Sequence, residues 1–360
     1  MKTQKTPYGS LKAKIAGPVN FDAPNLGNWK VQDSLPERWL NYSDTGAAWV
    51  DADHYTTVNP LKTATLPYLY VDEYGFHAGV HLWRGYFNGT PTAVYLNVQG
   101  GIAHGWSAFL NGKFIGSFLG DVHSAAGNKT LSFPEDTLLE SGTNVLLIIQ
   151  DNTGHDEGSA SINPRGILNA TLIGSSSSFS SWKVAGTAGG SSNTIVDPVR
   201  TYYNEGGLTA ERLGWHLPDF DDSDWPAGSP SEGFMGAGVK FYRSPVTLNT
   251  PEGHDVALSL KFSYDTTRVA TFRALVYVNG YQYGRFYPNL NAVGTFPVPP
   301  GIWKYDGQNL VGVALWAQSE DGAKVDLDIQ VNYVVESSLN VKFDGDYLRP
   351  GWDADRMKYA

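Results

Sequence analysis

Residues 109–116 read FLNGKFIG, and residues 277–284 read YVNGYQYG. In each stretch an Asn-Gly pair separates two apolar runs, which is a strong signal of a β-hairpin because a type I′ turn needs positive φ at both central residues. The two Asn-Gly pairs are 168 residues apart (279 − 111). Each is followed by a Gly-x-Asn before a long apolar run, in SGTNVLLII (141–149) and DGQNLVGVA (306–314). The sequence therefore predicts one β unit that occurs twice.

Strand patterns continue outside these hairpins. Residues 325–333 read VDLDIQVNY, in which apolar and polar residues alternate as they do in a strand with one buried face. The continuous runs VLLIIQ (145–150) and LVGVALW (310–316), apolar except for Gln150, indicate strands that are buried on both faces. No helical periodicity lasts longer than about two turns, because Gly and Pro interrupt every candidate. The chain is therefore predicted to be all-β, with two antiparallel β-sandwich domains in tandem.

The length of the chain agrees with two domains. It has 360 residues, more than one hydrophobic core usually organises. A Ser/Gly-rich segment at 174–193 has the composition of a flexible joint. We predict an N-terminal extension over residues 1–20, a first sandwich domain over residues 21–175 and a second over residues 176–360.

Composition and charge exclude several classes of protein. The formal net charge of −10 argues against nucleic acid and anionic membranes as partners, since both attract basic patches. The chain has no cysteine, which excludes disulfides and thiolate metal sites. No run of about 18 apolar residues is present to span a membrane. The basic N-terminal segment, residues 1–17, lacks the apolar core of a secretory signal.

Four Asn-x-Ser/Thr sequons occur in the first half of the chain. Their acceptor residues are Asn41, Asn88, Asn128 and Asn169. N-glycosylation occurs on the surface of secreted proteins, so the sequons indicate an extracellular parent protein. Because this chain carries no signal peptide, we interpret it as a piece of a longer protein.

Four long segments resemble one known family. They are DSLPE (33–37), EYGFHAGVHLWRGYF (73–87), NVQGGIAHGWSAFLNGKFIGSF (97–118) and YNEGGLTAERLGWHLPDF (203–220). In this order they resemble the C-terminal jelly-roll region of fungal β-galactosidases of glycoside hydrolase family 35, over nearly the whole chain. One departure is Glu73, where the family is expected to have Asp.

The resemblance implies a fold and a function. The two sandwiches are expected to be of jelly-roll, galactose-binding-like type. The parent enzyme is expected to hydrolyse terminal β-D-galactosides with retention, using two glutamates of a barrel that this chain lacks. We therefore expect no catalytic residue and no cofactor here. The expected role is a scaffold for the catalytic barrel, which would need an exposed apolar patch for docking.

The pair Asn204-Glu205 raises the opposite hypothesis, because an asparagine precedes the acid/base glutamate of many retaining glycosidases. Such enzymes need two carboxyl groups about 5–5.5 Å apart. In barrel enzymes both lie at the ends of barrel strands, and no alternating βα pattern surrounds Glu205. We therefore interpret Glu205 as part of a turn that opens the second sandwich.

Two groups of residues resemble metal sites but lack the necessary ligands. DFDDSDW (219–225) is rich in carboxylates but lacks the Gly and the final Glu of a calcium loop. His77 and His81, four residues apart, have no third ligand near them for zinc. We expect a polar turn and a hydrogen-bonded histidine pair on one strand face, and no metal.

Aromatic residues support an alternative function, that of a free-standing carbohydrate-binding module. Pyranose C–H faces pack on aromatic rings as apolar surface. The candidates near the two hairpins are Trp106, Tyr281, Tyr283 and Tyr287. Under this alternative the ligand would be a galactoside or polysaccharide.

Overall fold

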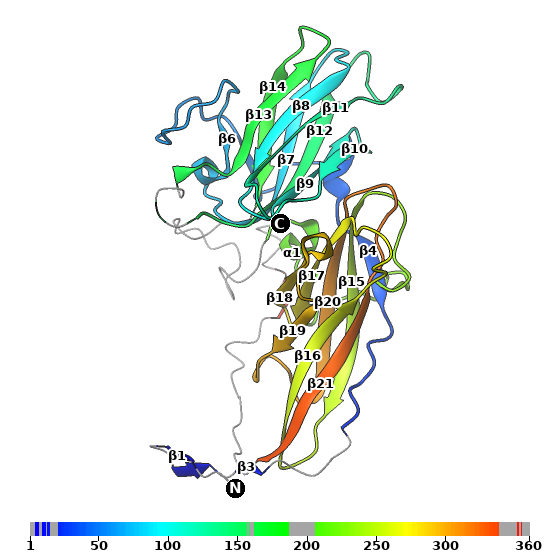
Figure 1. Ribbon diagram of the computed structural model, residues 1–360. Helices are drawn as coiled ribbons and strands as arrows, with labels where there is room; N and C mark the ends of the chain where they lie inside the picture. Colours follow the sequence, from blue (N-terminus) through cyan, green and yellow to red (C-terminus); the bar gives the residue numbers. More distant parts are fainter. Residues whose placement is uncertain are drawn as a thin grey trace.

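The computed structural model describes residues 4–6, 9–11, 13–14, 21–156, 158, 162–186, 206–337, 351–352 and 354. Nearly all regular structure in this part of the chain is antiparallel strand, arranged as two sandwiches one beyond the other (Figure 1). The predicted all-β tandem fold of jelly-roll type is confirmed. Among the described residues, no helix is long and apolar enough to cross a membrane.

The first sandwich pairs a six-stranded sheet with a four-stranded sheet. The six-stranded sheet contains, in spatial order, β10 (Lys113–Phe118), β9 (Gly105–Leu110), β12 (Asn144–Asn152), β7 (Gly79–Phe87), β14 (Phe179–Ala185) and β5 (Trp49–Asp51). The four-stranded sheet contains β11 (Ala126–Ser132), β8 (Ala93–Gln99), β13 (Gly166–Ile173) and β6 (Leu69–Tyr70). Apolar side chains of both inner faces form the first core.

The second sandwich pairs a five-stranded sheet with a four-stranded sheet. The five-stranded sheet contains β18 (Tyr281–Phe286), β17 (Phe272–Val278), β20 (Asp306–Ala317), β15 (Gly238–Asn249) and β4 (Lys30–Asp33). The four-stranded sheet contains β19 (Thr295–Val298), β16 (His254–Ser263), β21 (Asp326–Ser337) and β3 (Ala13–Lys14). These inner faces form a second core of their own.

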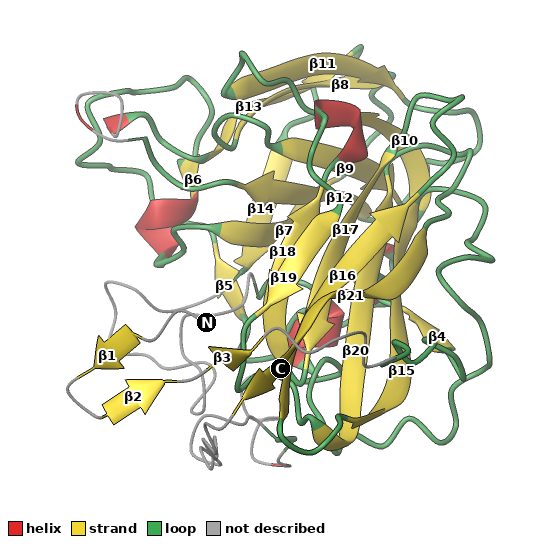
Figure 2. Cartoon of the chain, turned by 60° about the horizontal axis from the view of Figure 1, so that its bottom comes forward, coloured by secondary structure: helices red, strands yellow, loops and turns green. Residues whose placement is uncertain are grey.

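Helical segments are few and short (Figure 2). In the part of the chain that the structure describes, the helical elements with assigned bounds are the 3-10 helices η1 (Pro36–Arg38), η2 (Val71–Tyr74) and η4 (Pro288–Leu290) and the single-turn helix α1 (Thr209–Arg212). Strands β1 (Gln4–Thr6) and β2 (Gly9–Leu11) form a separate hairpin.

The repeated Asn-Gly turns are confirmed as equivalent hairpins. Asn111 and Gly112 join β9 to β10 with φ of 50° and 91°, and Asn279 and Gly280 join β17 to β18 with φ of 49° and 88°. Positive φ at both positions is what a type I′ turn requires, and the Asn-Gly pair meets this requirement at low cost.

In each repeat, the asparagine of the Asn-Gly turn is hydrogen-bonded to the asparagine of the Gly-x-Asn sequence that follows it. The Asn111 Nδ2 amide donates to Asn144 Oδ1 at 2.7 Å, and the Asn279 Nδ2 amide donates to Asn309 Oδ1 at 2.8 Å. Asn144 and Asn309 are the asparagines of the two Gly-x-Asn sequences. Each hairpin turn is therefore fixed to the start of the neighbouring long strand, β12 or β20.

The sheets do not follow the predicted domain limits at two places. β4 lies in the second sandwich, because residues 30–33 pair with β15 although they precede the first sandwich in sequence. β14 lies in the first sandwich, because it pairs with β7 and β5 although it begins at Phe179. Backbone hydrogen bonds to an open sheet edge decide both placements, and composition alone gave no sign of them.

Candidate functional site at the seam of the two sandwiches

The two sandwiches meet through a third cluster of buried side chains, which we call the seam. It lies between the outer face of the six-stranded sheet and the outer face of the five-stranded sheet. Its principal members are Leu82, Phe109, Leu147 and Ile149 of the first sandwich, and Val239, Phe241, Leu275, Tyr277, Ala314 and Trp316 of the second. This contact explains why the apolar runs of β12 and β20 are buried on both faces, as their sequences predicted.

The conspicuous stretch 206–220 lies at the seam. In its helix α1, Glu211 accepts a hydrogen bond from the Tyr277 hydroxyl, and Arg212 Nη2 forms an ion pair with Glu37. Burial raises the pKa of Glu37, although the Arg212 charge opposes this shift. The hypothesis about catalysis concerned Glu205, which lies outside the described residues. The described part of the stretch joins the second sandwich to the chain segment around η1.

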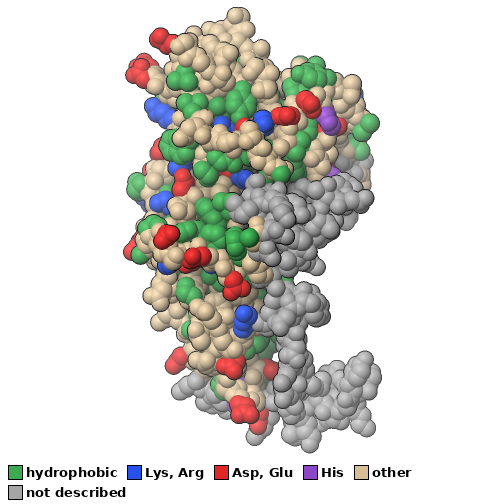
Figure 3. Space-filling view, turned by 180° about the vertical axis from the view of Figure 1, so that it is seen from behind, with side chains coloured by type: hydrophobic (Ala, Val, Ile, Leu, Met, Phe, Trp, Pro, Cys, Tyr) green, Lys and Arg blue, Asp and Glu red, His purple; other side chains and the backbone are tan. Residues whose placement is uncertain are grey.

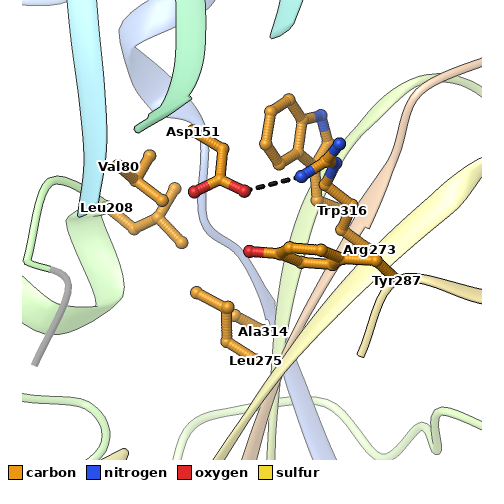
Figure 4. Close-up of a pocket in the computed structure, with 8 residues that line it drawn as sticks. All are labelled: Val80, Asp151, Leu208, Arg273, Leu275, Tyr287, Ala314 and Trp316. Carbon is orange, nitrogen blue, oxygen red and sulfur yellow. Dashed lines mark hydrogen bonds and ion pairs between the residues drawn. The ribbon is translucent and has the colours of Figure 1, made fainter. Parts of the chain in front are cut away.

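A buried carboxylate is the centre of the seam. Asp151, at the end of β12, accepts hydrogen bonds from Arg273 Nη1 on β17 at 2.6 Å and from Arg285 Nη2 on β18 at 2.5 Å. Arg273 Nη2 also donates to the Leu119 carbonyl at 2.8 Å, and its guanidinium lies 4.2 Å from the Tyr287 ring centroid. We call Asp151, Arg273 and Arg285 the Asp151 clamp. It joins one residue of the first sandwich to two of the second. Figure 4 shows the contact between Asp151 and Arg273.

Electrostatics keep this carboxylate ionised. Burial raises the pKa of Asp151, but the charges of Arg285 and Arg273 outweigh burial and hold that pKa below its usual range. Arg285 donates to Oδ1 and Arg273 donates to Oδ2, so each oxygen of the carboxylate has a charged donor from the second sandwich.

The cavity beside the clamp is small and has little scope for chemistry. Its described lining consists of Val80, Asp151, Leu208, Arg273, Leu275, Tyr287, Ala314 and Trp316. The free volume is ≈ 10 Å³, about the space that one water molecule needs. Asp151 is the single carboxylate among these described residues, whereas retaining hydrolysis of a glycoside needs a pair. The arrangement can fasten two domains, and it has no second carboxylate with which to cleave a glycosidic bond.

Each sandwich has a further arginine that forms an ion pair from a strand to an aspartate of an earlier loop. Arg84 on β7 pairs with Asp44 at 3.0 Å, and Arg243 on β15 pairs with Asp222 at 2.6 Å. Counted from the hairpin strands β10 and β18, β7 and β15 are each the fourth strand of their sheet. The two ion pairs therefore lie at equivalent positions of the two sandwiches. Lys30 also binds Asp222, at 3.0 Å. The carboxylates of 219–225 thus include a structural ion pair, and no metal-binding group of three or more ligands occurs among the described residues.

The two histidines near the start of β7 lie in different surroundings. His77 precedes the strand, which begins at Gly79, and its Nδ1 lies 2.8 Å from Asp72 Oδ1. His81 is fully buried, and the Asn152 Nδ2 amide donates to its Nε2 at 3.2 Å. The expectation that both histidines lie on one strand face is therefore wrong, because His77 is not in the strand.

Two buried histidines, His81 and His104, are expected to make the folded chain less stable in acid. Burial lowers the pKa of His81 to about 4, and that of His104 to about 4. The unfolded chain binds these protons below pH about 6.5, while the folded chain resists them down to pH about 4. The free energy of unfolding should therefore fall as pH drops from about 6.5 to about 4, by about 3 kcal/mol or less per imidazole.

Urea titrations at several pH values test this dependence. His81→Gln keeps an acceptor for Asn152 and removes one titration, so its unfolding free energy should change less over the same acidic range. His123→Gln, at an exposed position, is the control and should follow the unmodified chain. Equal pH slopes for all three proteins would contradict the assignment.

The aromatic residues proposed for sugar binding occupy different environments. Trp106 is 0% exposed in the first core, where its Nε1 donates to the Gly127 carbonyl, so the prediction of an exposed ring is wrong for it. It belongs to β9 and not to the turn that follows. Tyr287 is buried beside the Asp151 clamp. Tyr281 and Tyr283 are half-buried on β18.

The sequons lie mostly at the surface. The side chains of Asn41, Asn88 and Asn128 are exposed, and that of Asn169 is half-buried on β13. Each of the four is thus reachable in part by solvent, as an N-glycan requires.

The Asp151 clamp was missed by sequence reasoning, although a signal for it exists. Asp151 follows the apolar run of residues 145–149 after one glutamine, and Arg273 interrupts the apolar run TFRALVYV (271–278). Charged residues inside strands that are buried on both faces are rarely unpaired. Opposite charges in two such runs could therefore have been matched with each other.

The sheets and the seam define a class of protein: a tandem β-sandwich region in which buried ion pairs join two domains. More particularly, the chain belongs to the family described as the beta-galactosidase second all-beta domain, whose sequence model matches residues 42–156 and 209–321. One matched range falls in each sandwich, in agreement with the predicted repeat.

Curated relatives match along the whole chain. The probable beta-galactosidase B of Aspergillus niger is 53% identical and that of Pyrenophora tritici-repentis is 54% identical, each over 100% of this chain. The chain spans 36% and 35% of the lengths of these two relatives. Among solved structures, the GH78 family rhamnosidase of Bacillus sp. GL1 matches 84% of this chain and 35% of its own, with 13% identity and a TM-score of 0.27. That likeness is too low to support a conclusion.

Proposed function

We propose that the chain is the C-terminal, non-catalytic β-sandwich region of a secreted retaining β-galactosidase, and that it scaffolds the catalytic barrel. The observation that carries this proposal is the pattern of coverage: the whole chain aligns with only about a third of relatives named as probable beta-galactosidases. The seam supports it, because the clamp joins the two sandwiches by two ion pairs. Substrate hydrolysis is assigned to the part of the parent enzyme that the match does not cover.

One loop supplies apolar surface for such a partner. Residues 52–68 join β5 to β6, and Asn59 Nδ2 donates to the Ile162 carbonyl at 2.9 Å, which ties this loop to the loop between β12 and β13. Large exposed apolar side chains of the two loops are Tyr55, Val58, Leu61, Leu66 and Ile162. Val58 is 100% exposed. On the face shown in Figure 3, hydrophobic side chains form groups among polar ones. We propose that the 52–68 loop contacts the barrel.

Co-expression of two chains tests the scaffold and its surface. This chain would be expressed in a secretory yeast with the part of the Aspergillus niger relative that the match leaves uncovered. We expect the two to copurify. Val58→Asp with Leu61→Asp should weaken the complex at least tenfold, since each buries a charge at the contact.

Met235→Asp is the matched control, because Met235 is 81% exposed on the second sandwich. It should leave the complex unchanged. If the chains do not associate, the scaffold proposal fails. If the control variant weakens the complex as much as the loop variant, the scaffold stands and the assignment of the loop fails.

Carbohydrate binding at strand β18 is the second candidate. Tyr281 and Tyr283, both half-buried on this edge strand, support it as aromatic surface, although Tyr283 also packs against the second core. Calorimetric titration with lactose separates the two candidates: a module of this kind should release or absorb heat at millimolar sugar, and Tyr281→Ala should abolish that heat. Absence of heat in the unmodified chain would reject this candidate.

A further inference from the structure

Two sequons lie side by side on one face of the first sandwich. In the four-stranded sheet, β8 is flanked by β11 and β13. Asn97 on β8 is the register partner of Asn128 on β11 and of Asn169 on β13. The acceptor asparagines are thus separated by two strand spacings, about 10 Å. Their distance in sequence hides this proximity.

The same register places an aromatic ring between the two sequons. Tyr95 is the partner of Thr130 and of Thr171, the third residues of the two sequons. The alternate residues of β8, Val94, Leu96 and Val98, are buried in the first core, so Tyr95 and Asn97 lie on the outer face. This outer face therefore presents one tyrosine and three asparagines in two adjacent rows.

Asn97 Oδ1, between the two acceptor asparagines, is buried and accepts no hydrogen bond from any described residue. Asn169 Oδ1 accepts a hydrogen bond from the Thr171 hydroxyl at 2.6 Å. Because the Asn97 oxygen is out of reach of solvent, the contact that this face offers to a sugar is the half-buried ring of Tyr95.

We infer that the outer face of β11, β8 and β13 is a binding surface for the protein's own N-glycans at Asn128 and Asn169. The first sugar of each glycan, an N-acetylglucosamine, packs a C–H face on the Tyr95 ring. This contact follows from the chemistry of the ligand, which presents an apolar ring face to the aromatic side chain.

The glycan surface is separate from the scaffold role and rests only on the proposed passage through a secretory pathway. Two bulky glycans would cover the outer sheet face and keep it in solvent.

The test compares the glycosylated and unglycosylated full chain, made in a secretory yeast and in bacteria. Glycopeptide mass spectrometry should find both Asn128 and Asn169 occupied. Thermal unfolding should show that glycosylation raises Tm by about 2–4 °C, the shift that one favourable contact gives a domain of this size. Tyr95→Ser should remove most of that difference, although it also changes the Tm of the bacterial protein.

Thr130→Val and Thr171→Val each delete one sequon while keeping a β-branched side chain, and each should lose part of the gain. Thr90→Val is the control, because it deletes the turn sequon at Asn88 and should leave the Tyr95-dependent gain intact. The inference is overturned if Asn128 and Asn169 stay unmodified while Asn88 is occupied, or if the gain is the same with and without Tyr95. Neither outcome bears on whether the chain binds a catalytic partner.

Discussion

Asp151→Ala is expected to lower the free energy of unfolding by about 3–5 kcal/mol, because it leaves two guanidinium groups at the seam without their carboxylate. Arg273 is almost fully buried, so water cannot replace the lost partner. The loss should appear as uncoupling of the sandwiches: urea unfolding, followed by tryptophan fluorescence and by circular dichroism, should change from one transition to two.

Acid should reduce the effect of this substitution. The pKa of Asp151 in the folded chain lies below its usual value near 4, so its stabilisation is present above that pH and is lost as pH falls through the folded-state pKa. The difference between the variant and the unmodified chain should therefore narrow below pH about 4. Asp328→Ala, at an exposed position of β21, is the matched control and should stay within about 0.5 kcal/mol. An equal loss in both variants would show that the clamp does not join the domains.

Gly207→Ala should have the second largest effect, of about 1–3 kcal/mol or more. A Cβ at Gly207 would lie 1.8 Å from the Val80 carbonyl oxygen, which belongs to the backbone of β7 and cannot move aside as a side chain could. The segment that carries Leu208 into the seam would therefore have to move away from the first sandwich. The substitution should thus separate the two sandwiches at the seam through a steric clash. The charged residues of the Asp151 clamp are unchanged.

Chemical denaturation with Gly27→Ala as the control tests this expectation. A Cβ added at Gly27 would have no atom within 4 Å of it, so an added methyl group should change stability little. If Gly207→Ala is as stable as Gly27→Ala, the close packing of residues 206–208 against β7 is not a feature of the protein in solution.

Local chemistry made much of the fold predictable. Asn-Gly fixes the sign of two consecutive φ angles, so both hairpins could be read from four residues. The alternation in 325–331 likewise matches the buried and exposed faces of β21. It fails at Tyr333, predicted for the buried face but 59% exposed, because the strand register is irregular between Val331 and Tyr333. These features depend on residues that are near each other in the chain.

The seam depends on residues that are far apart, and sequence reasoning did not find it. Asp151 and Arg273 are separated by 122 residues, so no local pattern links them. Trp106 lies near a turn, which favoured an exposed platform, yet the register of β9 directs it into the core. The distant pairing of β4 with β15 was missed for the same reason.

Hydrolysis of a chromogenic β-galactoside by the purified 360-residue chain tests the central claim most directly. We predict no turnover above the blank for the chain alone, and turnover when it is co-expressed with the uncovered part of the Aspergillus niger relative. Turnover by the chain alone that disappears in Glu205→Gln would contradict the non-catalytic role, because it would place the catalysis in a sandwich domain.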